Sequence, residues 1–489
     1  MSERGVLSGL DPALLWERFG ELTAIPRPPK EEAEVRAYVL ARAAHLGLAS
    51  AIDAEGNVLV HMPASVGREN AATVVLQSHL DMVCERDPGS DFDPREGRIR
   101  VVVDGDWVVA PETTLGADNG IGVAAALAVA EDPSLEHGPV ELLFTVAEEQ
   151  GLDGAKALEP SFVSGRVLVN LDGTSDEALT IGCAGALHTF TRVRLSPAQL
   201  STGYVALGVA LSGARGGHSG ADIVRGRVNA IAALGRVLSR AREQAPFRLA
   251  RLDGGVSRNA IPRDAAAVVA LAPVTQALFR DGAERELQAL REQYAGTDDE
   301  LTLEIREVER GSAAGEQATA RTLDLLATIP SGVVAMSPDV PGTVETSTSL
   351  TVAATEADVI TLSSMTRSAN PQALEEVVGR ILAAARLAGA EVELLRSYTP
   401  WRPNLESPLL ATARTTFERV HGSSPRLEIV HGGLECAVIA DRLPGMDMVA
   451  IGPEIVGMHA PGERLNIPST QRFYRLLTAL LDDISAERR

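Results

Sequence analysis

The pattern of apolar and polar positions divides the chain into stretches of different character. From residue 12 to about residue 48 the pattern is helical, with prolines at 26, 28 and 29 that predict an extended break between two helices. Apolar runs then alternate with helical patterns up to about residue 186, and Leu142–Val146 is apolar without alternation, as in a strand buried on both faces of a sheet. Strands alternating with helices predict an α/β domain with a mostly parallel sheet. The predicted strands lie at 57–62, 72–83, 140–150 and 166–173, and a small-residue helix lies within 113–132.

The pattern of apolar and polar positions changes at about residue 187, where long strand patterns are mixed with the patterns of long amphipathic helices. Two successive units of this kind are predicted, the second beginning near residue 300, and we see no clear residue identity between them. The α/β pattern returns after residue 400. We therefore expect an α/β domain at 1–186 and 401–489 and, inserted into it, an α+β domain at 187–400 made of two similar units. The predicted helices of the inserted domain are 227–244, 274–294, 318–329 and 371–395.

Composition narrows the classes of partner. The chain has 489 residues and a net charge of −21, which argues against binding to a nucleic-acid backbone or an anionic membrane. Its three cysteines are too few for a disulfide framework and form no CxxC pair for a thiolate zinc site. No apolar run has the length of a signal peptide or of a membrane span. We expect a cytoplasmic protein that acts on small molecules.

Ionisable residues end the apolar runs of the α/β part. In open α/β sheets, ligands bind at the carboxyl ends of the strands, so these side chains are expected to converge. The same loops contain almost no Lys or Arg to balance the carboxylates, and bound divalent metal is the simplest counter-charge. Each motif by itself has an ordinary reading as a surface turn or a solvated helix face. The residues are His79, Asp81, Asp118, Glu148, Glu149, Asp172 and His459.

The order and spacing of these motifs resemble the M20 family of co-catalytic metallopeptidases over nearly the whole chain. The segments "HGGLECAVI" and "IGPEIVGMHAPGERL" and the large inserted domain are most similar to its aminoacyl-histidine dipeptidase branch, which splits Xaa-His dipeptides such as carnosine. The remaining motifs that carry the resemblance are "SHLDMV", "LGADNGIGVA", "AEEQGLDGA", "LDG", "GGHSG" and "NAIP".

The resemblance implies a zinc-peptidase catalytic domain with two divalent metal ions. His79 and Asp172 would bind one ion, Glu149 and His459 the other, and Asp118 would bridge both. Imidazole and carboxylate ligands suit Zn²⁺ and also admit Mn²⁺ or Co²⁺. The resemblance further suggests a cis peptide bond between Asp118 and Asn119.

Two further acidic residues are expected to serve catalysis. Asp81 lies two positions after His79, so on an extended strand both point to one face, and Asp81 is placed to orient the imidazole. Adjacent side chains on extended backbone face different ways, so Glu149 can bind metal while Glu148 stays available as the general base that activates a metal-bridging water.

The resemblance places substrate-binding residues mainly in the inserted domain, which acts as a lid. His218 would help to stabilise the tetrahedral oxyanion, and Asn259 and Arg367 would hold the substrate's C-terminal carboxylate, a task that suits the guanidinium fork. In the "HGGLEC" segment, which we expect in the α/β part, Gly433 would allow close approach of the substrate. Glu435 would either contact substrate or stabilise this loop.

The expected function is hydrolysis of Xaa-His and related dipeptides, including β-alanyl-histidine. A dipeptidase of broader specificity and an amidohydrolase of N-acyl amino acids share the same chemistry, and only the lid and the "HGGLEC" loop would separate them. A metal-dependent binding protein without catalysis is the alternative from another class, and Glu148 argues against it. A homodimer is compatible with the sequence, but we expect the doubled lid to make each chain self-contained.

Overall fold

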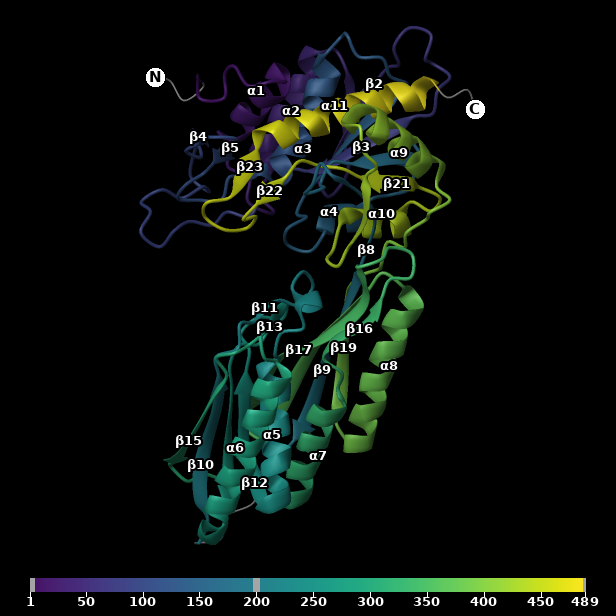
Figure 1. Cartoon of the computed structure of the whole chain (residues 1–489). Coiled ribbons are helices and arrows are strands. Elements are labelled where there is room, and N and C mark those ends of the chain that lie inside the picture. The colour runs from purple at the N-terminus through teal and green to yellow at the C-terminus, as the bar shows by residue number, and fades with distance from the viewer. Residues whose placement is uncertain (1–4, 197–202, 487–489) are drawn as a thin grey trace. The chain divides into compact units, whose positions relative to one another are not determined.

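The computed structural model describes residues 5–196 and 203–486 and divides into two compact units (Figure 1). Unit 1 comprises Met1–Cys183, Trp401–Glu428 and Leu434–Arg489, and unit 2 comprises Ala184–Pro400 and Ile429–Gly433. The chain therefore leaves unit 1 and returns to it twice. None of the helices in the described residues combines the length and apolar character that crossing a membrane requires.

An eight-stranded sheet forms the centre of unit 1. In spatial order its strands are β1 (Ala49–Ile52), β2 (Val58–Met62), β6 (Val140–Thr145), β3 (Val74–His79), β7 (Val167–Asn170), β21 (Asp447–Ala450), β8 (Ala178–Cys183) and β20 (Arg426–Val430). The neighbours β6, β3, β7 and β21 run parallel. Antiparallel strands adjoin this group on both sides. The prediction of an α/β domain with a mostly parallel sheet is confirmed.

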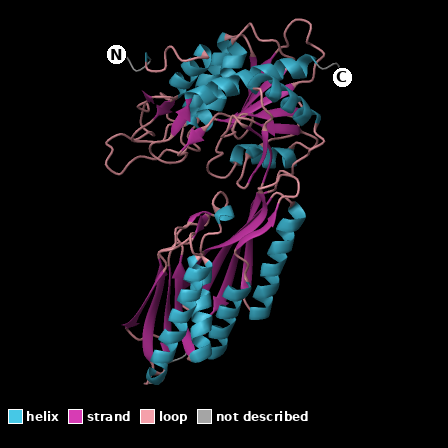
Figure 2. Cartoon of the chain, viewed as in Figure 1, coloured by secondary structure: helices cyan, strands magenta, loops and turns pink. Residues whose placement is uncertain are grey.

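Helices and a small second sheet complete unit 1 (Figure 2). The helix α3 is apolar all round and almost fully buried, which explains its run of alanine and glycine. The helices are α1 (Ala13–Leu22), α2 (Ala33–His45), α3 (Ala117–Glu131), α4 (Asp153–Ala157), α9 (Pro408–His421), α10 (Glu435–Arg442) and α11 (Ile467–Ala486). The second sheet is antiparallel and contains β22 (Ile455–Val456), β23 (Arg464–Asn466), β5 (Trp107–Val109) and β4 (Val102–Asp104).

Unit 2 is built on one antiparallel nine-stranded sheet. Its strands, in order, are β15 (Thr302–Val308), β10 (Val205–Ser212), β14 (Ala265–Leu271), β12 (Phe247–Gly254), β17 (Val344–Glu356), β18 (Val359–Ser368), β9 (Gly185–Arg194) and β19 (Glu391–Tyr398), with β16 (Gly332–Met336) paired to β17. The helices are α5 (Ala230–Gln244), α6 (Gln276–Gln293), α7 (Glu316–Thr328) and α8 (Pro371–Ala388). All four contribute buried side chains to one core cluster together with the sheet. A two-stranded ribbon of β11 (Gly217–His218) and β13 (Ala260–Ile261) is separate from this sheet.

The inserted part differs from the prediction in three respects. Its sheet is continuous, and β15, expected in the second unit, pairs with β10 of the first. The predicted helix 371–395 ends at Ala388, because Gly389 adopts a left-handed conformation (φ 65°) that caps it, and the chain continues as β19 against β9. Residues 429–433 group with unit 2, whereas the sequence placed this segment in the α/β part.

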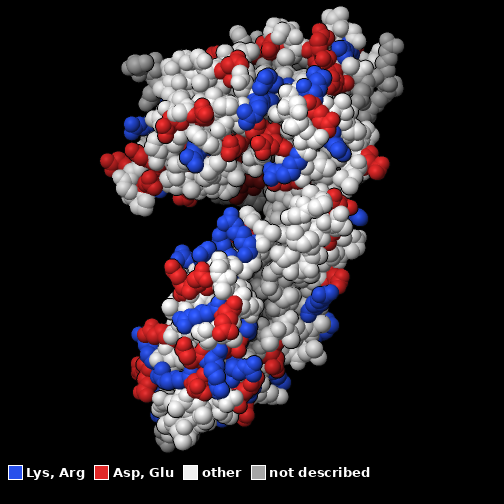
Figure 3. Space-filling view, viewed as in Figure 1, with Lys and Arg blue, Asp and Glu red and all other residues white. Residues whose placement is uncertain are grey.

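Charged side chains are mixed on the molecular surface. On the face drawn in Figure 3, Lys and Arg side chains are interleaved with Asp and Glu side chains on both units. The charge pattern of this face therefore does not single out one element as a binding surface.

Candidate metal centre

Three neighbouring parallel strands of unit 1 end side by side and carry ionisable residues at their ends. His79 is the last residue of β3 and pairs with Thr145, the last residue of β6. Glu148 and Glu149 follow β6, and Asp172 follows β7, the other neighbour of β3. These residues therefore meet at the carboxyl edge of the sheet.

Asp118 reaches the same place from the start of α3. Gly116 has a left-handed conformation (φ 68°) before this helix, and Asp118 and Asn119 depart from helical geometry. The Asp118–Asn119 peptide bond is cis, as predicted. The Asn119 side chain donates hydrogen bonds to Asp172 Oδ1 (2.6 Å) and to the carbonyl oxygen of Leu171 (3.0 Å), which joins the start of α3 to the end of β7.

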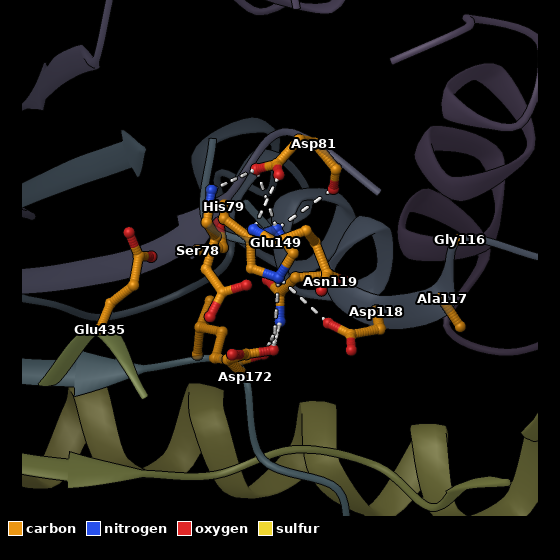
Figure 4. Close-up of polar contacts among 12 residues, drawn as sticks. Ser78, His79, Asp81, Gly116, Ala117, Asp118, Asn119, Glu149, Asp172 and Glu435 are labelled. Atoms are coloured by element: carbon orange, nitrogen blue, oxygen red, sulfur yellow. Dashed lines mark hydrogen bonds and ion pairs between the residues drawn. The ribbon is translucent and has the colours of Figure 1, made fainter. Parts of the chain in front are cut away.

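The Asp118 carboxylate lies between two imidazoles. Its Oδ1 is 3.0 Å from His79 Nε2, and its Oδ2 is 3.2 Å from His459 Nε2. His79 Nε2 is also 3.8 Å from Asp172 Oδ1, and His459 Nε2 is 3.0 Å from Glu149 Oε1. Figure 4 shows His79, Asp118, Glu149 and Asp172 converging from separate elements. The structure thus brings together all five residues that the sequence predicted as metal ligands.

The donor atoms fall into overlapping groups that could each hold a metal ion. Two of these groups share Asp118. In each of the two, one imidazole nitrogen faces oxygens of two different carboxylates, and a single N–H can satisfy only one of them well. A cation placed among the three donor atoms would interact with all of them, so the donor set fits a metal better than a proton. The groups are His79, Asp118 and Asp172; Asp118, Glu149 and His459; and His79, Glu148 and Glu149.

The protonation equilibria of these residues reflect buried negative charge. Burial lowers the pKa of His79, but its contacts with Asp118 and Asp81 outweigh this effect and raise it. Hydrogen bonds to Asp118 and Glu149 raise the pKa of His459 to about 11. Burial and the neighbouring Asp118 raise the pKa of Asp172. A divalent cation would lower these raised pKa values, since it favours neutral imidazole and ionised carboxylate.

Asp81 supports both sides of this centre. Its carbonyl oxygen is 3.1 Å and its Oδ1 is 3.4 Å from Nδ1 of His79. Its carboxylate also accepts hydrogen bonds, both of 3.0 Å, from the backbone N–H groups of Glu148 and Glu149. Asp81 therefore contacts the imidazole from behind, as predicted, and additionally fixes the backbone of the glutamate pair, which the sequence did not indicate.

Glu148 and Glu149 have different surroundings, although they are adjacent in the chain. Glu149 faces His459, whereas no residue in the described ranges donates a hydrogen bond to the Glu148 carboxylate. Burial raises the pKa of Glu148 well above its usual value, and the nearby Glu149, Asp172 and Glu435 raise it further. An acidic side chain with a raised pKa and no partner is suited to accept a proton during a reaction.

In unit 2, the β11–β13 ribbon brings His218 next to the segment of Asn259. His218 pairs with Ala260, and the N–H of Ser219 donates to the carbonyl oxygen of Asn259 (2.7 Å). Nδ1 of His218 accepts hydrogen bonds from two backbone N–H groups, at 3.2 Å and 3.0 Å. A neutral His218 therefore carries its proton on Nε2, where it can be donated.

Arg367 is an enclosed cation that has no carboxylate partner among the residues the structure describes. It lies in β18, is 4% exposed, and donates from Nη1 to the hydroxyl of Tyr398 (3.1 Å). Within the described ranges its Nε has no hydrogen-bond partner and the guanidinium forms no ion pair. A buried guanidinium in this state is costly unless an anion binds it, so the geometry suits a carboxylate ligand.

The segment 431–433 contains the predicted Gly433 and adds His431, which the sequence analysis did not single out. His431 Nε2 is 2.7 Å from Oγ of Ser347, which lies opposite Arg367 in the sheet. A Cβ atom on Gly433 would lie 2.7 Å from the ring of Tyr398, so this glycine is required for close packing. The only sequence signal for His431 was its place at the start of the "HGGLEC" motif.

Glu435, in contrast, lies inside unit 1. It is 1% exposed at the start of α10, and its Oε2 accepts hydrogen bonds from the side chains of Gln77 (2.5 Å) and Thr145 (2.6 Å). Gln77 in turn accepts a hydrogen bond from Asn170, whose Oδ1 is bonded by the N–H of Asp172. Glu435 therefore belongs to a buried polar network behind the strand ends.

Comparison with known proteins agrees with this architecture. Residues 75–483 match the model of peptidase family M20/M25/M40. The chain is 36% identical to the cytosol non-specific dipeptidase of Escherichia coli (strain K12) over 482 residues, which cover 98% of this chain and 99% of that protein. It is 35% identical to the aminoacylhistidine dipeptidase of Vibrio alginolyticus, whose crystal structure matches with a TM-score of 0.89 over 97% of each chain. The fold alone is shared with aminopeptidase PepT from Bacillus cereus ATCC 10987, which is 18% identical with a TM-score of 0.58 over 97% of this chain and 99% of that one. The chain belongs to peptidase family M20/M25/M40.

Proposed function

We propose that the protein is a metal-dependent dipeptidase that hydrolyses the peptide bond of Xaa-His and related dipeptides, including β-alanyl-histidine. The observation that carries this proposal is the shared carboxylate of Asp118, which lies between two imidazoles, with the unpartnered carboxyl group of Glu148 nearby. Family membership and the names of the two relatives over 30% identical support the same reaction class.

Two divalent ions would fit the donor set. One would be held by His79 and Asp172, the other by Glu149 and His459, with Asp118 bridging them. Zn²⁺ suits imidazole and carboxylate ligands, and Mn²⁺ or Co²⁺ would also be accepted. Bound ions would supply Lewis-acid polarisation of the scissile carbonyl and a lower pKa for the attacking water.

The residues of the chain then divide the remaining work. Glu148 takes a proton from the attacking water and passes it to the nitrogen of the leaving amine, so that the amine departs neutral. Asp81 holds His79 and the backbone of the glutamate pair in place. The proton on His218 Nε2 stabilises the negative charge that develops on the carbonyl oxygen.

The C-terminal carboxylate of the substrate would bind Arg367. A dipeptide offers this carboxylate close to its only peptide bond, and the enclosed guanidinium has an Nε available for it. Asn259 would add a hydrogen bond, and Gly433 would leave room for the substrate backbone. Unit 1 would thus act as the catalytic domain and unit 2 as a lid that closes on the dipeptide during turnover.

In this proposal Glu435 has a structural role and does not contact the substrate. Its carboxylate is engaged by Gln77 and Thr145, and the network continues to the backbone of Asp172. We infer that it fixes the strand ends beneath the metal ligands.

The names of the two relatives differ in the breadth of specificity, since one is named for aminoacyl-histidine substrates and the other as non-specific. The cytosolic name of the Escherichia coli relative supports a cytoplasmic location, and a homodimer is compatible with the proposal.

A substrate panel tests the function. The protein is stripped of metal with a chelator, reloaded with Zn²⁺, Mn²⁺ or Co²⁺, and assayed with β-alanyl-histidine, glycyl-histidine, alanyl-alanine, N-acetyl-histidine and a tripeptide. We expect hydrolysis of the histidine dipeptides and little turnover of N-acetyl-histidine and of the tripeptide. Equal turnover of alanyl-alanine would indicate a dipeptidase of broader specificity. Preferred turnover of N-acetyl-histidine would make the protein an amidohydrolase, and metal binding without any turnover would make it a binding protein.

A further inference from the structure

A single buried carboxylate holds the backbone that leads into Asp118. Glu463 is 2% exposed and accepts four backbone hydrogen bonds. Its Oε2 accepts from the N–H groups of Leu115 (2.7 Å) and Gly116 (3.0 Å), and its Oε1 from those of Ala117 (2.9 Å) and Asp118 (3.3 Å). Every N–H from residue 115 to residue 118 is thus directed at one side chain.

The same residue is fixed in the loop that carries His459. The N–H of Glu463 donates to the carbonyl oxygen of Ala460, and its own carbonyl oxygen accepts from the N–H of Ala110. The N–H of Gly462 is bonded to the carbonyl oxygens of Ala110 and Thr113. His459 itself has a left-handed backbone conformation (φ 62°), so its placement depends on the surrounding loop.

Arg27 secures the opposite side of the Asp118 loop. It is 1% exposed and donates to the carbonyl oxygen of Gly116 (2.6 Å) and to those of Leu80 and Asp81 (both 3.3 Å). The loop is therefore held through its N–H groups by Glu463 and through a carbonyl oxygen by Arg27, which also holds the segment after His79. A Cβ atom on Gly116 would lie 2.6 Å from the Arg27 guanidinium.

We propose that Glu463 is a positioning residue that sets the distance between Asp118 and His459 and so forms the metal site in advance. This inference rests on the metal centre of the proposed function. Asp118 belongs to two of the three candidate metal groups, and His459 to one of these two. Displacing the loop at 115–118 relative to the loop at 457–463 would therefore weaken binding of both ions. Loss of such supporting hydrogen bonds lowers metal affinity in other metalloproteins by roughly 10- to 100-fold.

The decisive variant is Glu463→Gln, which keeps the size of the side chain. Its amide nitrogen cannot accept hydrogen bonds and would face two backbone N–H groups, so two buried donors lose their acceptor. Binding of Zn²⁺ alone is measured by competition with a chelating dye, and binding of Co²⁺ alone by its visible absorption spectrum, which reports ligand geometry.

The chain offers a closely matched control. Glu141, also 2% exposed, accepts hydrogen bonds from the backbone N–H groups of Ser164 and Gly165 and from the Ser164 hydroxyl. It lies near the start of β6, at the end of the strand opposite to the glutamate pair. Glu141→Gln imposes the same kind of loss on the fold without touching either ligand loop.

We expect Glu463→Gln to bind Zn²⁺ at least 10-fold more weakly than Glu141→Gln and to show an altered Co²⁺ spectrum, while Glu141→Gln keeps the wild-type spectrum. Equal metal affinity in the two variants would overturn the inference. If Glu463→Gln does not yield folded protein, Glu463→Asp replaces it in the comparison with Glu141→Gln. This variant keeps the charge but has a shorter side chain. A wild-type protein that binds neither metal would overturn the proposed function and this inference with it.

Discussion

At the scale of single residues, the metal centre depends on small differences between like side chains. Asp81 holds the backbone N–H groups of Glu148 and Glu149 through its two carboxylate oxygens. With the backbone fixed, the two side chains separate, and only Glu149 meets His459. The adjacent carboxylates can therefore take different roles, one in binding metal and one in moving a proton.

This difference predicts opposite results for two substitutions. Glu148→Gln should lower the rate of dipeptide hydrolysis by a factor of about 10²–10⁴, the usual contribution of a general base, while two metals stay bound. Glu149→Ala should instead lower metal content. Elemental analysis of the purified variants and steady-state kinetics measure both effects. A Glu148→Gln protein that loses its metals would contradict this division of roles.

Arg367 allows a second prediction at this scale. Loss of a hydrogen-bonded partner for a charged group costs about 1.5–3 kcal/mol, so Arg367→Gln should reduce kcat/KM for a dipeptide by about 10- to 150-fold. A dipeptide amide lacks the carboxylate and should be an equally poor substrate for wild type and variant. If the variant loses the same factor on the amide, Arg367 does not bind the carboxylate.

At the scale of elements, the segment 429–433 is attached to β17 by an imidazole that stays neutral. Burial, together with the positive charge of Arg367 and the nearby His218, lowers the pKa of His431 to about 3. In the unfolded chain the same side chain has a pKa near 6.5. The unfolded state therefore binds the proton more readily than the folded state.

This difference in proton binding makes the stability of the folded protein depend on pH. Between about pH 6.5 and pH 3 the unfolded chain carries an extra proton, so the free energy of unfolding should fall as the pH falls, by up to about 1.4 kcal/mol per pH unit from His431. His431→Asn removes this contribution. Denaturant unfolding of metal-free wild type and variant at pH 7 and pH 5 should show a smaller loss of stability in the variant. Equal losses would show that His431 is protonated in the folded protein.

Local sequence patterns predicted elements well where one periodicity dominated. The strands that end at His79 and Thr145 and the buried α3 were predicted because their apolar runs are unambiguous. The strand β19 was missed because "EVELLRSY" continues a helical pattern past Gly389, and only pairing with β9 makes it a strand. The pairing of β15 with β10 has no local signature either, since it joins segments about a hundred residues apart along the chain.

Long-range contacts of single side chains could not be predicted either, because they have no local signature in the sequence. Glu463 and Arg27 bind backbone groups, and a backbone N–H or carbonyl oxygen looks the same at every position of a sequence. The meeting of the candidate metal ligands could be predicted because imidazole and carboxylate groups are chemically distinctive and follow strand ends.

At the scale of the whole molecule, the residues proposed to bind substrate lie in unit 2 and the metal centre lies in unit 1 of one chain. If each chain is self-contained, mixing inactive His218→Ala with inactive Glu148→Ala under conditions that exchange subunits should restore no activity. Exchange is verified separately with two labelled populations. Recovered activity would show that His218 serves the partner's active site.

The position of β21 has a consequence for biosynthesis. This strand pairs with both β7 and β8, yet along the chain it comes after the whole of unit 2. While the ribosome makes the intervening chain, on the order of tens of seconds at usual translation rates, β7 and β8 have no partner on that side. Unpaired strand edges invite association with other chains. The nascent protein therefore passes through a long interval in which its first-made domain is incomplete and its inserted domain can already fold, and during this interval it should depend on chaperones.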